Sequence, residues 1–149
     1  MAKGFAQSFK VAIGAVDTVQ QEDLGVVRYT DNAVYKYVKF SGTTTIAVGD
    51  ALCYVITDLN LQTVDKANSA VGAGIATVAV TSGTVQYGWI QIGGIATLST
   101  TTGGAVGNSL SNIGASAGAI IPIAAHTSPQ VGVLVNASAP ILVQLDYLN

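Results

Sequence analysis

The sequence predicts an all-β protein, a compact β-barrel or sandwich of about ten short strands. Half of the 149 residues are hydrophobic, but these are chiefly Ala, Val and Ile, with 17 Gly and only 3 Phe in the chain. Short runs of Val and Ile alternate with polar residues and are separated by Gly, Ser, Asn or Asp. No long segment repeats Leu, Glu, Lys or Arg every 3.6 residues, so any helix is confined to a turn at 65–70 or within the first 24 residues.

The first predicted pair of strands is a hairpin over residues 25–40 that turns at Asp31-Asn32. Alternation along its second strand separates two tyrosines and a lysine from a second lysine and two apolar residues. One face holds Tyr35, Tyr37 and Lys39, and the other holds Lys36, Val38 and Phe40. Tyrosines on such strands usually pack in cores or at protein interfaces, so Tyr35 and Tyr37 are candidate packing or interface residues.

Seven further strands are expected where short runs of Val and Ile recur: 51–57, 74–80, 85–92, 95–99, 119–124, 131–135 and 141–147. Residues 83–98 contain the only tryptophan and no charged side chain. Alternation places Trp89 on the face opposite Ile90 and Ile92, and Gly93-Gly94 is expected to end this strand. Trp89 is therefore a third candidate packing or interface residue.

A weak internal repeat suggests that the barrel is built from two similar halves. Residues 47–52, with the order Ala-Val-Gly-Asp, are echoed by residues 105–110, with Ala-Val-Gly-Asn. In the same way, 70–72 followed by 89–92 resembles 130–132 followed by 142–145. Chance similarity in a chain rich in Val and Gly is the alternative explanation. We expect residues 25–149 to form a single β-barrel domain.

Residues 1–24 are expected to be an N-terminal arm or the first strand of the barrel. Phe5 and Phe9 lie four residues apart and are flanked by Lys3, Lys10 and small residues, which cannot build a core of their own. In an arm that orders on a partner, the two rings would be anchors and the two lysines would meet an acidic surface. The alternative is a strand that belongs to the barrel itself.

The charged residues are few and lie mainly in the first half of the chain. They make up 9% of it, against about 25% in ordinary soluble domains. Residues 67–145 contain no Lys, Arg, Asp or Glu, so this half presents either a polar uncharged surface or one covered by neighbouring molecules. The net charge of −2 argues against nucleic acid as a partner.

No stretch approaches the roughly 18 apolar residues of a membrane helix, and the run after Lys10 is too short for an export signal.

The sequence contains little that could perform catalysis. A triad from among Asp50, Cys53, His126 and Ser128 is not supported, because no nucleophile motif surrounds a serine and Cys53 lies in an apolar strand. One histidine and one cysteine cannot form a zinc cluster, and His126 is expected in a solvated loop. The spacing of Asp58, Asn60 and Asp65 does not match a helical calcium-binding loop. We therefore expect no enzyme, no cofactor and no metal site.

These elements in this order resemble a known family. An N-terminal tail, the hairpin Leu-Gly-Val-Val-Arg-Tyr…Tyr-Lys-Tyr-Val-Lys-Phe, and paired Val-Gly-Asp/Asn and Val-Gly…Ile/Leu-Val-Gln modules are similar to the capsid decoration, or cement, proteins of tailed bacteriophages, over most of residues 25–147. The resemblance implies a small β-barrel virion protein, commonly a homotrimer, that clamps major capsid protein subunits on the outside of the phage head. Assembly in the host cytoplasm agrees with the lack of an export signal.

Two other classes of function stay open. A different virion β protein, such as a tail or fibre subunit, shares this composition. A carbohydrate-binding module is the other class, because an aromatic ring offers a flat apolar surface to a sugar. Its candidate stacking residues are Tyr29, Tyr35, Tyr37 and Tyr54.

Overall fold

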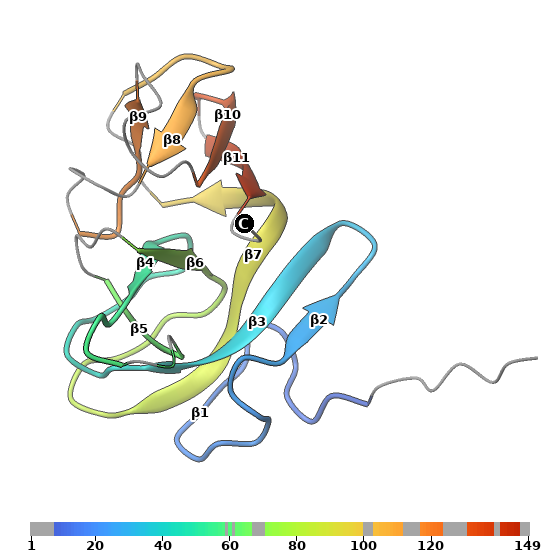
Figure 1. Cartoon of the computed structure of the whole chain (residues 1–149), viewed down its shortest axis with the longest axis vertical. Coiled ribbons are helices and arrows are strands. Elements are labelled where there is room, and N and C mark those ends of the chain that lie inside the picture. Colours follow the sequence, from blue (N-terminus) through green and yellow to red (C-terminus); the bar gives the residue numbers. More distant parts are fainter. Residues whose placement is uncertain are drawn as a thin grey trace, which may run out of the picture.

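The computed structural model describes residues 8–58, 60, 62–66, 71–99, 103–111, 117–123, 131–138 and 141–146 (Figure 1). These residues form eleven strands and no helix, which confirms the predicted all-β class. The strands are β1 (Val16–Asp17), β2 (Val27–Tyr29), β3 (Ala33–Phe40), β4 (Ala51–Tyr54), β5 (Thr63–Asp65), β6 (Gly72–Ala76), β7 (Gln86–Leu98), β8 (Ser109–Ser111), β9 (Ile121–Ile123), β10 (Gly132–Asn136) and β11 (Ile141–Asp146).

Five strands close into a barrel in the order β3-β5-β4-β6-β7, and β7 returns to pair with β3. Only the β3–β5 pair is parallel; the other four pairs are antiparallel. We call this closed part the ring barrel. Its interior is filled by small and medium apolar side chains, with Phe40 as the only large aromatic residue among its fully buried members. The side chains of β3 alternate between the two faces of the sheet as the sequence predicts, because Val38 and Phe40 point into the ring barrel.

The strand β7 continues past the ring barrel and starts a second layer, the upper sheet, in the order β7-β11-β10-β8-β9 (Figure 1). Its core is a separate apolar cluster that also takes in Ala51 of β4 and Ile75 of β6. The expected break at Gly93-Gly94 is wrong, because one strand spans both layers. The buried side-chain amide of Gln91 donates to the carbonyl oxygens of Gly93 (3.1 Å) and Ile95 (3.0 Å) and so holds the irregular segment within the strand.

The two layers repeat one strand order, as the sequence repeat suggests. The ring barrel contains β5-β4-β6-β7 and the upper sheet contains β9-β8-β10-β11, with antiparallel pairing throughout both sets. The turns before β4 and β8 also match: Gly49 donates to Ala76 O at 2.9 Å, and Gly107 donates to Leu134 O at 2.8 Å. Both glycines have positive φ, of 87° and 88°, a conformation that favours glycine.

One difference between the repeats fixes the two layers to each other. The side chain of Asn108 accepts a hydrogen bond from the N–H of Ala105, whereas the buried carboxylate of Asp50 accepts three: from Ala47 N–H (2.8 Å), from Ser99 Oγ (2.7 Å) and from Lys66 Nζ (2.9 Å). Ser99 follows β7 and Lys66 follows β5. Burial raises the pKa of Asp50, but these hydrogen bonds outweigh it and hold the pKa below its ordinary value.

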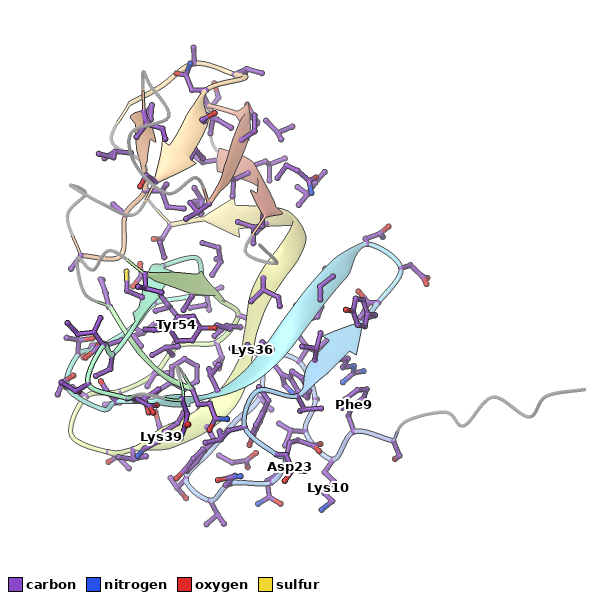
Figure 2. The ribbon with its side chains drawn as sticks, in the orientation of Figure 1. Phe9, Lys10, Asp23, Lys36, Lys39 and Tyr54 are labelled. Carbon is purple, nitrogen blue, oxygen red and sulfur yellow. The ribbon has the colours of Figure 1, made fainter. Side chains whose placement is uncertain are left out.

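Removing this carboxylate should destabilise the fold. Asp50→Ala would leave the Ala47 N–H and the Ser99 hydroxyl without their acceptor, and we expect a loss of about 2–3 kcal/mol in the free energy of unfolding. Asp23→Ala is the control, because the Asp23 side chain is exposed (Figure 2). Urea unfolding at neutral pH measures both changes. Equal stability of the two variants would show that the Asp50 contacts contribute nothing.

Acid should weaken the same contacts. Asp65 also has a lowered pKa, because burial is outweighed by hydrogen bonds from the hydroxyls of Ser41, Thr43 and Thr44. Since both folded-state pKa values lie below 3.8, ionised Asp50 and Asp65 stabilise the fold above that pH, and the stabilisation is lost as the pH falls below it. Urea midpoints from pH 6 to 2 should fall more steeply for the native chain than for Asp50→Asn with Asp65→Asn. Parallel curves would contradict this.

Candidate functional site

The aromatic residues singled out in the sequence meet on the outer face of the ring barrel. Tyr37 of β3 and Trp89 of β7 are direct cross-strand partners, and their rings lie 5.2 Å apart at 64°. Both side chains are 0% exposed, although they point away from the barrel interior. Their cover is the N-terminal part of the chain, together with half-buried Tyr35 and Tyr87.

Residues 8–17, which we call the strap, run across this aromatic face. Val11 is buried against Tyr37 and Trp89, and Phe9, Ile13 and Ala15 pack around the same cluster. The ring of Phe9 meets Trp89 edge-on, with centroids 5.3 Å apart and planes at 83°. This edge-to-face arrangement is favourable for aromatic pairs.

Polar groups hold the main chain of the strap. The indole Nε1 of Trp89 donates to the carbonyl oxygen of Val11 at 3.1 Å, and Arg28 Nη1 donates to the same oxygen at 3.5 Å. The carboxylate of Glu22 accepts the N–H groups of Lys10 and Val11, the latter at 3.2 Å. The Arg28 guanidinium also lies 4.9 Å from the centre of the Phe9 ring, within cation–π distance. The strap is therefore bound through one aromatic ring, that of Phe9, and through three main-chain groups of Lys10 and Val11. The side chain of Lys10 is exposed (Figure 2).

The end of the strap is the short strand β1, which pairs with β7 outside the ring barrel. Val16 faces Gly88 and Asp17 faces Tyr87. A Cβ atom at Gly88 would lie 3.0 Å from the carbonyl oxygen of Ala15, so glycine here permits the close approach of the strap. Beyond β1, the Tyr37 hydroxyl accepts the N–H of Gln21 at 3.3 Å, and burial is the main cause of its raised pKa.

The structure gathers four of the candidate residues from the sequence, Phe9, Tyr35, Tyr37 and Trp89, and places Lys10 beside them with an exposed side chain. Lys3 and Phe5 lie outside the described residues. Sequence reasoning missed Glu22 and Arg28, which complete the polar contacts to the strap. A carboxylate that accepts main-chain N–H groups eleven and twelve residues away has no characteristic sequence pattern.

The tyrosines considered for sugar stacking do not share one exposed face. Tyr37 is fully buried and Tyr35 is half-buried on the outer side of β3, whereas Tyr54 packs against the interior cluster of the ring barrel. Lys36 Nζ donates to the Tyr54 hydroxyl at 2.6 Å and lies 4.7 Å from the centre of its ring (Figure 2). Tyr29 alone among the four is well exposed, at 72%.

The candidate reactive residues are used internally or lie elsewhere. Cys53 is buried in β4, the Asp58 carboxylate accepts the N–H groups of Gln62 and Thr63, and Asp65 is held by hydroxyls. No group of three His, Cys, Asp or Glu side chains that could hold a metal ion occurs in the described part of the chain. His126 and Ser128 lie outside it. The described residues also contain no helix long and apolar enough to span a membrane.

A second surface covers the outside of β7, β11 and β10 in the upper sheet. Ile95 is paired with Gln144, and Gln144 with Val133, while the alternate residues Ala96, Val143 and Leu134 fill the core. Ile95 is 54% exposed and Val135 is 41% exposed. We call this surface the uncharged face; it comprises Ile95, Thr97, Val133, Val135, Leu142 and Gln144. It lies at the end of the molecule opposite the strap (Figure 1).

Truncating the Phe9 ring should loosen the strap and leave the ring barrel intact. A fully buried Phe→Ala change costs about 3–5 kcal/mol; for half-buried Phe9 we expect roughly half of that, enough to speed local opening at least tenfold. Hydrogen exchange at the Lys10, Val11 and Asp17 amides measures it, with the Ile90 amide as the internal reference. Tyr29→Ala is the matched control, because that ring is exposed. Unchanged exchange at the strap would contradict the anchoring role of Phe9.

Comparison of the chain with protein-family models, with curated proteins and with solved structures finds no match in any of the three. The chain's own surfaces are therefore the basis for inferring its function. Two surfaces stand out: an aromatic face covered by the strap, and an apolar face without charge at the other end of the molecule.

Proposed function

We propose that this protein is a virion structural protein that binds the outer surface of a phage head and stabilises the capsid by bridging major capsid protein subunits. The main support is the chemistry of the uncharged face: a sheet surface of Ile, Val, Leu, Thr and Gln, four of whose six side chains are exposed, in a half of the chain that has no Lys, Arg, Asp or Glu from residue 67 to 145. Exposed apolar patches of this kind mark contact surfaces.

The uncharged face suits contact between copies of the chain, and we propose a homotrimer joined there. A typical protein interface buries about 800 Å² per partner, and a lysine placed within such an interface would have to lose its hydration. The strap and the exposed Lys10 lie at the opposite end, and on this proposal that end meets the major capsid protein. The particle would be assembled in the host cytoplasm.

Stabilisation of the shell needs no chemistry on this proposal. Sites that bridge neighbouring capsid subunits exist only when those subunits are correctly spaced, so binding there favours the closed shell. A trimer also strengthens binding through several modest contacts, since each bound subunit raises the effective concentration of the next subunit at its site. On this proposal, three weak contacts per trimer keep the protein on the shell during heating or dilution, and they form together only where the capsid subunits are correctly spaced.

Charge on the uncharged face should abolish assembly. We expect Ile95→Lys combined with Val135→Lys to sediment as a monomer at micromolar concentration, because the two ammonium groups would be desolvated in the interface. Ile56→Lys is the matched control, since Ile56 is equally apolar and 69% exposed on the loop after β4. Undecorated heads should release DNA at lower temperature, and the native chain or the control should restore them whereas the double variant does not.

The contrary outcomes separate the alternatives. A native chain that sediments as a monomer and still decorates heads would refute the trimer. Undecorated heads that resist heat equally well, together with binding of the purified chain to a glycan array, would favour the carbohydrate-binding module. Labelling of the particle tail by antibodies would favour a tail or fibre subunit instead of a head protein.

A further inference from the structure

The strap is a separable part of the chain. Its buried residue Val11 and its anchor Phe9 pack only into the aromatic cluster on the outer face, which is distinct from the cluster that fills the ring barrel. Val16 alone of the strap touches the interior cluster, and it is only half-buried. The strap can therefore leave its position without removing a fully buried side chain from the interior of the ring barrel.

A short exposed segment connects the strap to the rest of the chain. All four residues from Thr18 to Gln21 are exposed, whereas Glu22 and the half-buried Leu24 stay with the body of the molecule. The contacts described for this segment are few: Gln21 N–H donates to the Tyr37 hydroxyl, and Gln20 Nε2 donates to the Glu22 carbonyl at 3.0 Å. These residues have the properties of a hinge.

The socket that receives the strap would recognise the same segment of another molecule. It is formed by Glu22, Arg28, Tyr37, Gly88 and Trp89, all on the body side of the hinge. Its polar groups bind main-chain groups of residues 10 and 11, and its aromatic surface binds the Phe9 ring. An empty socket would expose two aromatic rings that are now fully buried, so the state in which a strap occupies the socket is strongly favoured.

We propose that the strap exchanges between copies: residues 8–17 of one chain occupy the socket of a second chain, and reciprocal transfer links the copies. The exchanged pair makes the same interactions between strap and socket as the closed chain, so concentration and the length of the hinge decide between the two forms. The partner is thus a second copy of this chain. This inference does not depend on binding to a phage head, and it uses a different surface from the uncharged face.

The pairing of Asp17 with Tyr87 allows a direct test. Chains carrying Asp17→Cys are mixed with chains carrying Tyr87→Cys and oxidised. Neither chain can form this disulfide within itself, and the native Cys53 is buried. Each variant oxidised alone is the control for 17–17 and 87–87 disulfides, and a 17–87 disulfide identified by peptide mapping reports the strap of one chain in the socket of the other. We expect a covalent dimer on a non-reducing gel that increases with protein concentration.

Hinge length provides the second arm of the test. Deleting Val19 and Gln20 shortens the connection from four residues to two and should hinder the strap from folding back, so the linked fraction should rise severalfold, whereas inserting Gly-Ser pairs after Val19 should reduce it. A chain with both cysteines reports whether the pair can form a disulfide at all. If that chain closes only within itself, and the mixed chains stay unlinked at every concentration and hinge length, the strap does not exchange.

Discussion

The pairing of β7 with four other strands is the constraint on which the rest of this structure depends. β7 pairs through main-chain hydrogen bonds with β1, β3, β6 and β11. The strap, the ring barrel and the upper sheet are therefore all attached to this one strand. Its side chains divide accordingly: Ile90 and Ile92 enter the ring barrel, Trp89 supports the strap, and Ala96 and Leu98 begin the upper core. A Cβ atom at Gly94 would collide with the carbonyl oxygen of Asn32, so glycine is required where β7 passes the hairpin turn.

The repeated strand order explains how two thin cores support one fold. Each half alone has four strands, of which all but β7 have six residues or fewer, and a core of ten or fewer buried apolar residues in the described part of the chain, so each half gains stability from packing against the other. The ring barrel gains a fifth strand, β3, whereas the upper sheet is completed by Ala51 and Ile75 on the outside of the ring barrel. The halves differ at one turn position, where Asp50 accepts the turn hydrogen bond as Asn108 does and also binds Ser99 and Lys66.

Much of the fold could be predicted from local sequence patterns, but the long-range pairing could not. Alternation correctly separates Val38 and Phe40 from Tyr35 and Tyr37, and the Val-Gly-Asp/Asn repeat marks two equivalent turns. Gly93-Gly94 is misleading, because paired glycines signal both a strand end and a close approach of two backbones. The parallel β3–β5 pair and the contacts to the strap join residues far apart in the chain, and no local period encodes them.

Many of the charged side chains of this protein are engaged in internal contacts and are not fully exposed to solvent. Asp50, Asp65 and Glu22 use their carboxylates in internal hydrogen bonds, Lys66 pairs with Asp50, and Arg28 holds the strap. Lys10, Asp23 and Asp31 are the ionised side chains that are well exposed among the described residues. Long-range electrostatic attraction would therefore contribute little to association. On the proposed function, trimer formation must instead come from the fit of apolar sheet surfaces, and retention on the shell from the number of copies joined, which suits a protein that works as part of a symmetric shell.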